Sequence, residues 1–239
     1  RRQLEPLLEA NLMNSSAPQF GVQIEGAVYR DRPGAYGLIV KDQQVAVTRW
    51  RGTCDEARYS KLLAAVLASF RGNIFVYQGE ELGLPQANVA FEDLKDPEAI
   101  SNWPETLGRD GARTPMPWDG ETNRYAGFSD AKPWLPLQDN HAAASVALQS
   151  KDPNSVLNFT KQVIALRNGC EVLRQGEVQF PSEGELLILD RVYVGQTRRC
   201  VFNLGETDLT YDGQTDIEMS VGLVSSVIGA GSGFISKVS

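Results

Sequence analysis

Cysteine and histidine are scarce in this chain of 239 residues, which has three cysteines and one histidine. Cys54, Cys170 and Cys200 lie far apart and form no CxxC or Cys/His spacing. Neither a zinc site nor a disulfide framework is therefore indicated. We expect reduced, structural thiols, no metal site and no cofactor.

Basic residues are outnumbered, since 23 Lys and Arg stand against 30 Asp and Glu and give a formal net charge of -7. No run of basic residues forms the patch that a nucleic-acid-binding surface needs. No apolar run reaches the roughly 20 residues of a membrane helix, and the N-terminus has no apolar signal segment. We expect no nucleic-acid partner, no membrane contact and a cytoplasmic location. The sequence indicates no oligomeric state.

Hydrophobic periodicity predicts two helices around one buried strand. In residues 54–70, apolar side chains recur at offsets 0, 3, 4, 7, 8 and 11 from Tyr59, which is one face of a helix. The apolar run at 73–78 is typical of a buried parallel strand. A second helix is predicted after Asp152, with Asp152 as its cap and Pro153 at its first position.

The two ends of the chain are rich in short strand-like segments. Beyond Gly176, such segments are broken by Gly, Asp and Asn, which predicts a small antiparallel β domain. Near the N-terminus, residues 35–40 and 44–48 flank a turn at 41–43 and predict a β-hairpin. Residues 84–150 between the helices have little periodicity, and a segment of that length inside a compact domain is usually functional.

The most irregular part of that segment is "LGRDGARTPMPWDG" at 107–120. It combines Arg109 and Arg113 with two prolines and Trp118, and it fits neither helical nor strand periodicity. Arginine offers several planar hydrogen-bond donors, and tryptophan offers a flat apolar face. Loop geometry alone is the alternative interpretation, in which Arg109 pairs with Asp110 and the tryptophans only pack.

Four motifs in order resemble the α-glucosidase and oligo-1,6-glucosidase branch of the α-amylase family, glycoside hydrolase family 13. They are "FVYQGEELGLP", "LGRDGARTPMPW", "KPWLP" and "DPNSVLNFTKQVIALR". The resemblance covers about residues 50–239. It implies an α/β fold: the last part of a TIM (β/α)8 barrel, with 73–78 as its last strand, followed by an antiparallel all-β C-terminal domain.

The resemblance also implies roles for site residues. In a TIM barrel the active site lies in the loops at the C-terminal ends of the strands, so 107–120 would line the pocket. We therefore expect Arg109 and Arg113 to contact an oligosaccharide of α-glucosides. Gln78, Glu80, Glu81 and Trp118 would shape the site, and hydrogen bonding that only fixes the local turn is the alternative for the two glutamates.

The catalytic carboxylates that the resemblance implies are not found. Retaining glycosidases need a carboxylate nucleophile and a carboxylic acid about 5 Å apart. The family carries the nucleophile in a Gly-Phe-Arg-x-Asp motif, which is missing here. Asp42 falls at the position of the family's transition-state-stabilising aspartate, but its neighbours Val40 and Lys41 replace asparagine and histidine. A hairpin-turn role is therefore the alternative for Asp42.

Residues 13–48 resemble the start of a Nudix hydrolase, although the magnesium-binding Nudix box is missing. We expect three parts: an N-terminal segment at 1–49, the last part of a glycosidase barrel at 50–172 and a C-terminal β domain at 173–239. The predicted function is an α-glucosidase of the retaining type, incomplete and inactive as this chain. A non-catalytic carbohydrate-binding or interaction module is the alternative, and a Nudix remnant is a third possibility.

Overall fold

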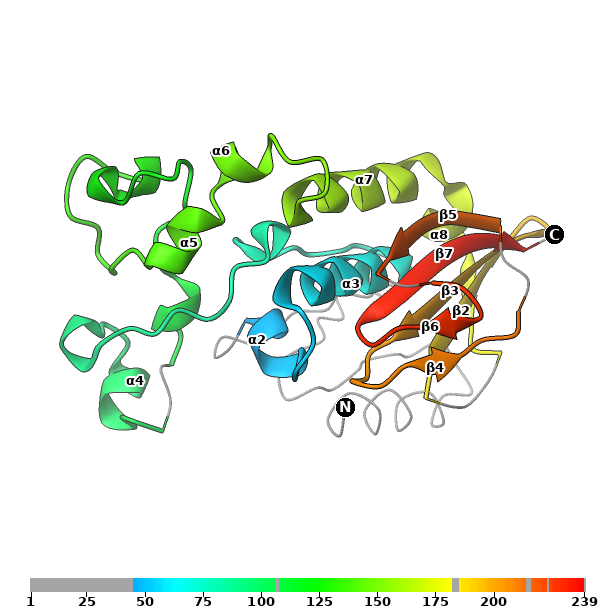
Figure 1. Cartoon of the computed structure of the whole chain (residues 1–239), viewed down its shortest axis with the longest axis horizontal. Coiled ribbons are helices and arrows are strands. Elements are labelled where there is room, and N and C mark those ends of the chain that lie inside the picture. The colour runs from blue at the N-terminus through cyan, green and yellow to red at the C-terminus, as the bar shows by residue number, and fades with distance from the viewer. Residues whose placement is uncertain (1–44, 106–107, 182–184, 214–215, 223, 239) are drawn as a thin grey trace.

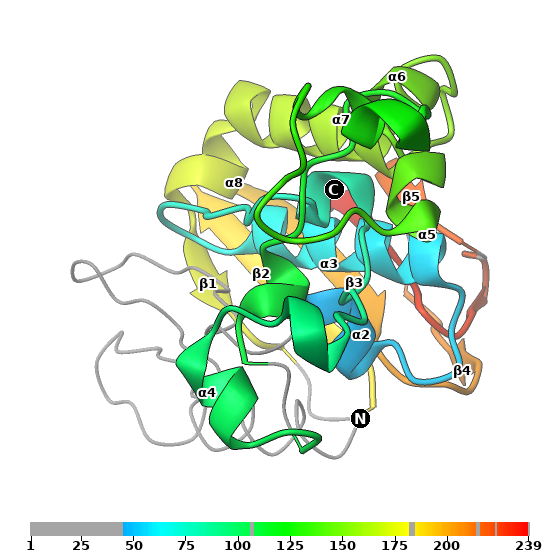
Figure 2. The same ribbon diagram turned by 90° about the vertical axis from the view of Figure 1, so that its left-hand side faces the viewer.

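The computed structural model describes residues 45–238 except 106–107, 182–184, 214–215 and 223. Two long helices lie side by side at the centre, and one of them packs on an antiparallel sheet (Figure 1). The irregular segment between the helices extends away from the sheet and carries only short helices (Figures 1 and 2). Among the described residues, no helix is long and apolar enough to cross a membrane.

The first long helix, α3 (Glu56–Ser69), confirms the helix predicted from periodicity. Asp55 caps it, because its carboxylate accepts a hydrogen bond of 2.8 Å from the backbone N–H of Arg58. Tyr59, Leu62 and Val66 are buried on the predicted face. This face contributes to a hydrophobic core that also includes residues of the sheet.

The second long helix, α7 (Val156–Gly169), begins three residues later than predicted, at Val156 and not at Pro153. The side chain of Ser155, not that of Asp152, accepts the hydrogen bond from the backbone N–H of Asn158. The predicted cap was therefore wrong, since Asp152 instead accepts from the N–H of Asn154 in the preceding turn. Phe159 and Val163 pack into the same core as α3.

The predicted antiparallel strands after Gly176 are present. Five form one sheet in the order β1-β2-β3-β7-β5, and two form a second sheet. Cys200 and Ile235 lie opposite each other at the centre of the larger sheet and are fully buried. The strands are β1 (Glu177–Gln179), β2 (Leu187–Tyr193), β3 (Gln196–Asn203), β4 (Leu209–Thr210), β5 (Asp216–Val221), β6 (Val227–Ile228) and β7 (Ser232–Val238).

Two buried arginines join the end of α3 to its surroundings. Arg167 of α7 donates to the backbone carbonyls of Ala68 at 2.7 Å and Phe70 at 2.6 Å, and also to that of Gly72. Arg191 of β2 donates to the carbonyl of Ser69 at 2.6 Å. The last carbonyls of a helix lack partners within it and carry partial negative charge, so guanidinium groups stabilise this end.

Two strand predictions were wrong. Residues 73–78 form no strand, because no described strand lies beside them to accept their backbone hydrogen bonds. Phe75, Val76 and Tyr77 are consequently 41 to 44% exposed. The second strand of the expected hairpin, at 44–48, was also wrong, because residues 46–48 belong to the helix α2 (Ala46–Trp50), which buries Val47 and Trp50 on one face. The remainder of the expected hairpin lies outside the described residues.

The segment between α3 and α7 contains short helices separated by turns. Its small hydrophobic clusters pack beneath these turns and are separate from the main core. The helices are η1 (Glu80–Leu82), η2 (Phe91–Asp93), α4 (Pro97–Ser101), η3 (Asp110–Ala112), η4 (Thr122–Gly127), α5 (Asp139–Ala143) and α6 (Val146–Gln149). One further helix, α8 (Glu171–Gln175), connects α7 to the sheet.

Candidate functional site

The loop at 108–120 is held by a reciprocal pair of buried carboxylates. Asp96, with its side chain 1% exposed, accepts from the Nε of Arg109 at 2.9 Å, from its Nη2 at 3.1 Å and from its backbone N–H at 2.9 Å. Asp110 accepts from the backbone N–H of Lys95 at 2.6 Å and of Asp96 at 2.8 Å. Each carboxylate therefore fixes the backbone next to the other.

This arrangement differs from the alternative interpretation, in which Arg109 pairs with Asp110. Asp110 is fully buried and its Oδ2 serves backbone N–H groups, so Arg109 uses Asp96 instead. The Arg109 guanidinium is the main reason that the pKa of Asp96 lies well below its ordinary value, with its backbone N–H second. A bidentate arginine-carboxylate pair has a fixed geometry, so Arg109 is committed to the loop frame.

Close backbone packing also holds the loop. The Gly111 carbonyl accepts from the backbone N–H of Ala87 at 2.9 Å. A Cβ at Gly111 would lie 2.7 Å from the Ala87 carbonyl oxygen and 2.3 Å from Nε2 of Gln86. Gln86 in turn accepts from the N–H of Val45 at 3.0 Å, which connects the loop frame to the start of α2.

Arg113 differs from Arg109 in its contacts. It is half-buried at the C-terminal cap of η3, and its guanidinium has no hydrogen bond or ion pair with any residue that the structure describes. A guanidinium presents five donors in a rigid fork. Of the two predicted arginines, Arg113 therefore retains the donors that a ligand would use.

His141 and Asp96 were not predicted as part of the loop frame. His141 is 2% exposed, its Nε2 lies 2.9 Å from the Pro85 carbonyl and its Nδ1 lies 3.4 Å from the Thr114 hydroxyl. Burial lowers the pKa of its imidazole. The sequence gives no indication of the His141 contacts, because a single histidine in a segment without periodicity fits no pattern. The Asp96-Pro97 pair, in contrast, is a helix-start signal from which Asp96 could have been predicted as a cap.

Glu80 and Glu81 fix the turn that precedes this frame. Glu80 accepts from the backbone N–H of Tyr77 at 2.9 Å, and Glu81 accepts from that of Gly79 at 2.8 Å. Gly79 has φ of 89°, a left-handed conformation that glycine adopts without strain. These contacts support the alternative of turn fixing, and the role of both glutamates in shaping a substrate site stays a prediction. Gln78 is exposed beside them.

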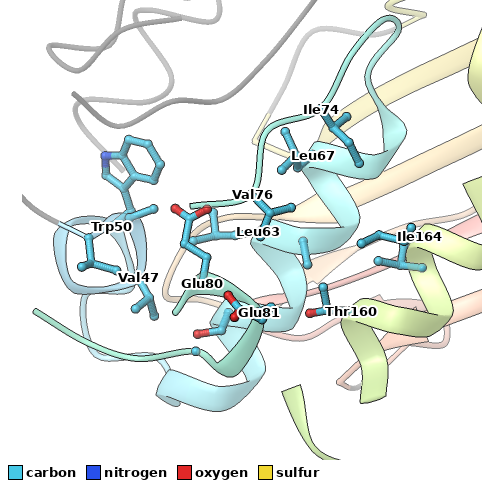
Figure 3. Close-up of a pocket in the computed structure, with 16 residues that line it drawn as sticks. Val47, Trp50, Leu63, Leu67, Ile74, Val76, Glu80, Glu81, Thr160 and Ile164 are labelled. Carbon is cyan, nitrogen blue, oxygen red and sulfur yellow. The ribbon is translucent and has the colours of Figure 1, made fainter. Parts of the chain in front are cut away.

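Both glutamates line an apolar groove between α2, α3 and α7. Figure 3 shows the Glu80 side chain extending toward the part of the groove where Trp50 and Val76 lie. Burial raises the pKa of Glu80 to about 7, and the charge of Glu81 adds to this effect. Glu80 is thus a carboxyl group that can be protonated near neutral pH.

Three tryptophans in the segment between α3 and α7 are exposed. Trp118 is 52% exposed and Trp134 is 66% exposed, so about half or more of the surface of each residue is accessible to a ligand. Trp103 is 40% exposed and its ring centroid lies 5.6 Å from that of Phe91. The expected contact of Trp118 with substrate stays a prediction. Asp42 lies outside the described residues, and within these no group of three metal-ligating side chains occurs.

Comparisons with known proteins match most of this chain to one family. The family "Alpha amylase, catalytic domain" matches residues 35–176. A probable alpha-glucosidase of Rhizobium meliloti (strain 1021) is 42% identical over 166 residues, which are 69% of this chain and 30% of that protein. An oligo-1,6-glucosidase of Heyndrickxia coagulans is 30% identical over 196 residues, which are 73% of this chain and 35% of that protein. The chain thus spans about a third of their length.

Solved structures agree with these matches. An alpha-glucosyl transfer enzyme, XgtA, is similar with a TM-score of 0.71 and 36% identity over 84% of this chain and 39% of that one. The trehalulose synthase MutB from Pseudomonas mesoacidophila MX-45 has a TM-score of 0.73 and 25% identity over 87% of this chain and 44% of that one. The family match begins at residue 35 and so includes part of the segment for which a Nudix-like start was expected; these comparisons give that expectation no support. The chain belongs to the α-amylase family of glycoside hydrolases.

Proposed function

We propose that this chain supplies the loop side of an α-glucosidase pocket that acts on short α-glucosidic oligosaccharides by a retaining mechanism. The observation that carries the proposal is Arg113, whose guanidinium has no partner among the described residues. Its loop is anchored by two buried carboxylates, those of Asp96 and Asp110. Donors on a rigid loop can bind sugar hydroxyls without the cost of ordering the loop backbone.

Arg109 contributes in a different way. Its side chain is 38% exposed and is bound bidentately by Asp96. We assign to it the support of the loop and to Arg113 the contact with a sugar hydroxyl or with a carboxylate of the pocket. Relatives named as alpha-glucosidase and oligo-1,6-glucosidase support α-glucosides as the substrate class.

The proposal includes the expectation that the chain by itself does not hydrolyse its substrate. The family's nucleophile motif is missing from its 239 residues, and a retaining glycosidase needs both carboxylates. We also propose that the protein acts in the cytoplasm. The alternative is a non-catalytic carbohydrate-binding module. The evidence for it would be sugar binding without hydrolysis even after a relative's preceding part has been added to complete the pocket.

Binding and turnover of the isolated chain test this proposal. We expect no release of aryl alcohol from an aryl α-glucoside, and a weak calorimetric signal with maltose that Arg113→Ala reduces. Arg124→Ala is the matched control, because Arg124 is an exposed arginine with a side chain 62% accessible. Turnover above background by pure protein, or maltose binding that is identical in Arg113→Ala, would contradict the proposal.

A further inference from the structure

A second cavity lies at the other end of the molecule from the site loop. It has a volume of about 620 Å³ and is formed by the end of α7, by α8 and by strands β2, β3 and β5. Cavities that bind small ligands typically measure roughly 300–1,000 Å³. Figure 1 shows α8 and the sheet at one end, and α4 and α5 of the irregular segment at the opposite end.

The turn that borders this cavity holds a residue in an unfavourable conformation. Tyr193 and Gln196 pair across the β2–β3 hairpin, which leaves Val194 and Gly195 as a two-residue turn. Both have positive φ, 47° for Val194 and 73° for Gly195. Such turns favour Asn-Gly, because a β-branched residue is strained at positive φ.

Val194 is also 81% exposed, the largest value among the exposed large hydrophobic residues that the structure describes. Neither hairpin geometry nor core packing explains a strained, exposed valine. Strained backbone is retained where the surrounding structure imposes it and clusters at binding and catalytic sites. The position of Val194 at the rim of the cavity gives the apolar side chain a surface to present to a ligand.

The cavity walls combine apolar and polar groups. Leu166, Val172 and the Tyr193 ring provide apolar surface, and Gly169 leaves open space, since a Cβ there would have nothing within 4 Å. The Tyr193 hydroxyl and the Gln196 amide are lining groups without a hydrogen bond to any described residue. They are therefore available as donors and acceptors to a ligand.

The charges that line the cavity are paired. Nε of Arg198 binds Glu218, and their side chains are 14% and 18% exposed. Glu218 also lies 3.5 Å from Nζ of Lys237, and Glu171 lies 3.9 Å from Nη2 of Arg174. Because each lining charge has an opposite partner, the cavity does not select an ionic ligand. It suits a neutral molecule that has both apolar faces and many hydroxyl groups.

We propose that the cavity between the α7–α8 junction and the β2–β3 turn is a second carbohydrate-binding site, which holds a short neutral oligosaccharide. A sugar ring has apolar C–H faces for Tyr193 and Val194 and equatorial hydroxyls for Gln196 and the Arg198–Glu218 pair. This site is separate from the pocket of the proposed function, so a substrate could be held by the sheet end while another sugar occupies the loop end.

The test is a titration of the full chain with maltotriose, followed by backbone amide resonances. We expect shifts at Gly169, Tyr193 and Gly195 in both the parent chain and Arg113→Ala, which separates this site from the proposed function. Val194→Asn introduces a residue that accepts positive φ more readily than valine, so the melting temperature should be unchanged or higher. Its affinity for maltotriose should fall about fivefold or more, through loss of an apolar contact.

Three results would overturn the inference. They are the absence of shifts at the cavity residues, affinity for maltotriose that is unchanged in Val194→Asn, and shifts with an apolar tripeptide such as Leu-Val-Leu but none with maltotriose. If Arg113→Ala weakens the calorimetric signal with maltose but maltotriose shifts no amide resonance at the cavity, the proposed function stands and only the second site is refuted.

Discussion

Replacement of Glu80 by glutamine tests the environment of the groove in Figure 3. Burial of Glu80 raises its pKa from 4.5 to about 7. The folded chain therefore binds the proton more tightly than the unfolded chain does. The resulting stabilisation is complete below pH 4.5 and is lost as the pH rises through about 7. The difference of about 2.5 pH units, at about 1.36 kcal/mol each, corresponds to about 3 kcal/mol.

Glutamine is neutral at every pH and keeps an oxygen to accept from the Tyr77 N–H. In urea denaturation from pH 4.5 to 7.5, the unfolding free energy of Glu80→Gln should therefore rise relative to the parent by about 3 kcal/mol. The pKa values of His141 and Asp96 are lowered, so these groups make the unfolding free energy rise with pH at lower pH. Both proteins share this contribution, so it cancels in the difference between Glu80→Gln and the parent. Glu92→Gln, an exposed control in η2, should show no such rise. A difference for Glu80→Gln that is constant with pH would refute the reasoning.

Two further variants test local structure by urea denaturation at neutral pH. Ser155→Ala should cost about 1 kcal/mol through loss of the α7 cap, and Asp152→Ala should cost less; equal or reversed costs would restore the cap predicted from the sequence. Gly111→Ala should cost about 1–3 kcal/mol, because the new methyl group would meet the Ala87 carbonyl and Gln86. Gly169→Ala, where the Cβ has open space, should be neutral or stabilising, and a similar cost at both glycines would contradict the close packing of the loop.

The sequence predicted the elements that are local in origin. The helix at α3 follows from its apolar spacing and Asp55, and the antiparallel strands after Gly176 follow from short segments broken by turn residues. The strand prediction at 73–78 was wrong because a strand needs partner strands, and no described strand lies beside these residues. The same apolar run without such neighbours stays extended and exposed.

The candidate site was predictable in part. Both arginines of the loop were identified, but which of them is engaged depended on Asp96, 13 residues away. No periodicity relates these positions, because the short helix α4 and a turn lie between them in the chain. A residue that fixes a loop from outside it, such as Asp96, therefore cannot be predicted from the sequence pattern of the loop.

A chimera tests the central claim most directly. It would carry the preceding part of the Rhizobium meliloti relative, which is 42% identical to this chain, ahead of Trp50. We predict that it hydrolyses an aryl α-glucoside. Arg113→Ala should lower its kcat/KM by about 10- to 100-fold, the effect of losing one hydrogen bond from a charged group. A folded chimera in which Arg113→Ala leaves kcat/KM unchanged would contradict the assignment of residues 107–120 to the substrate pocket.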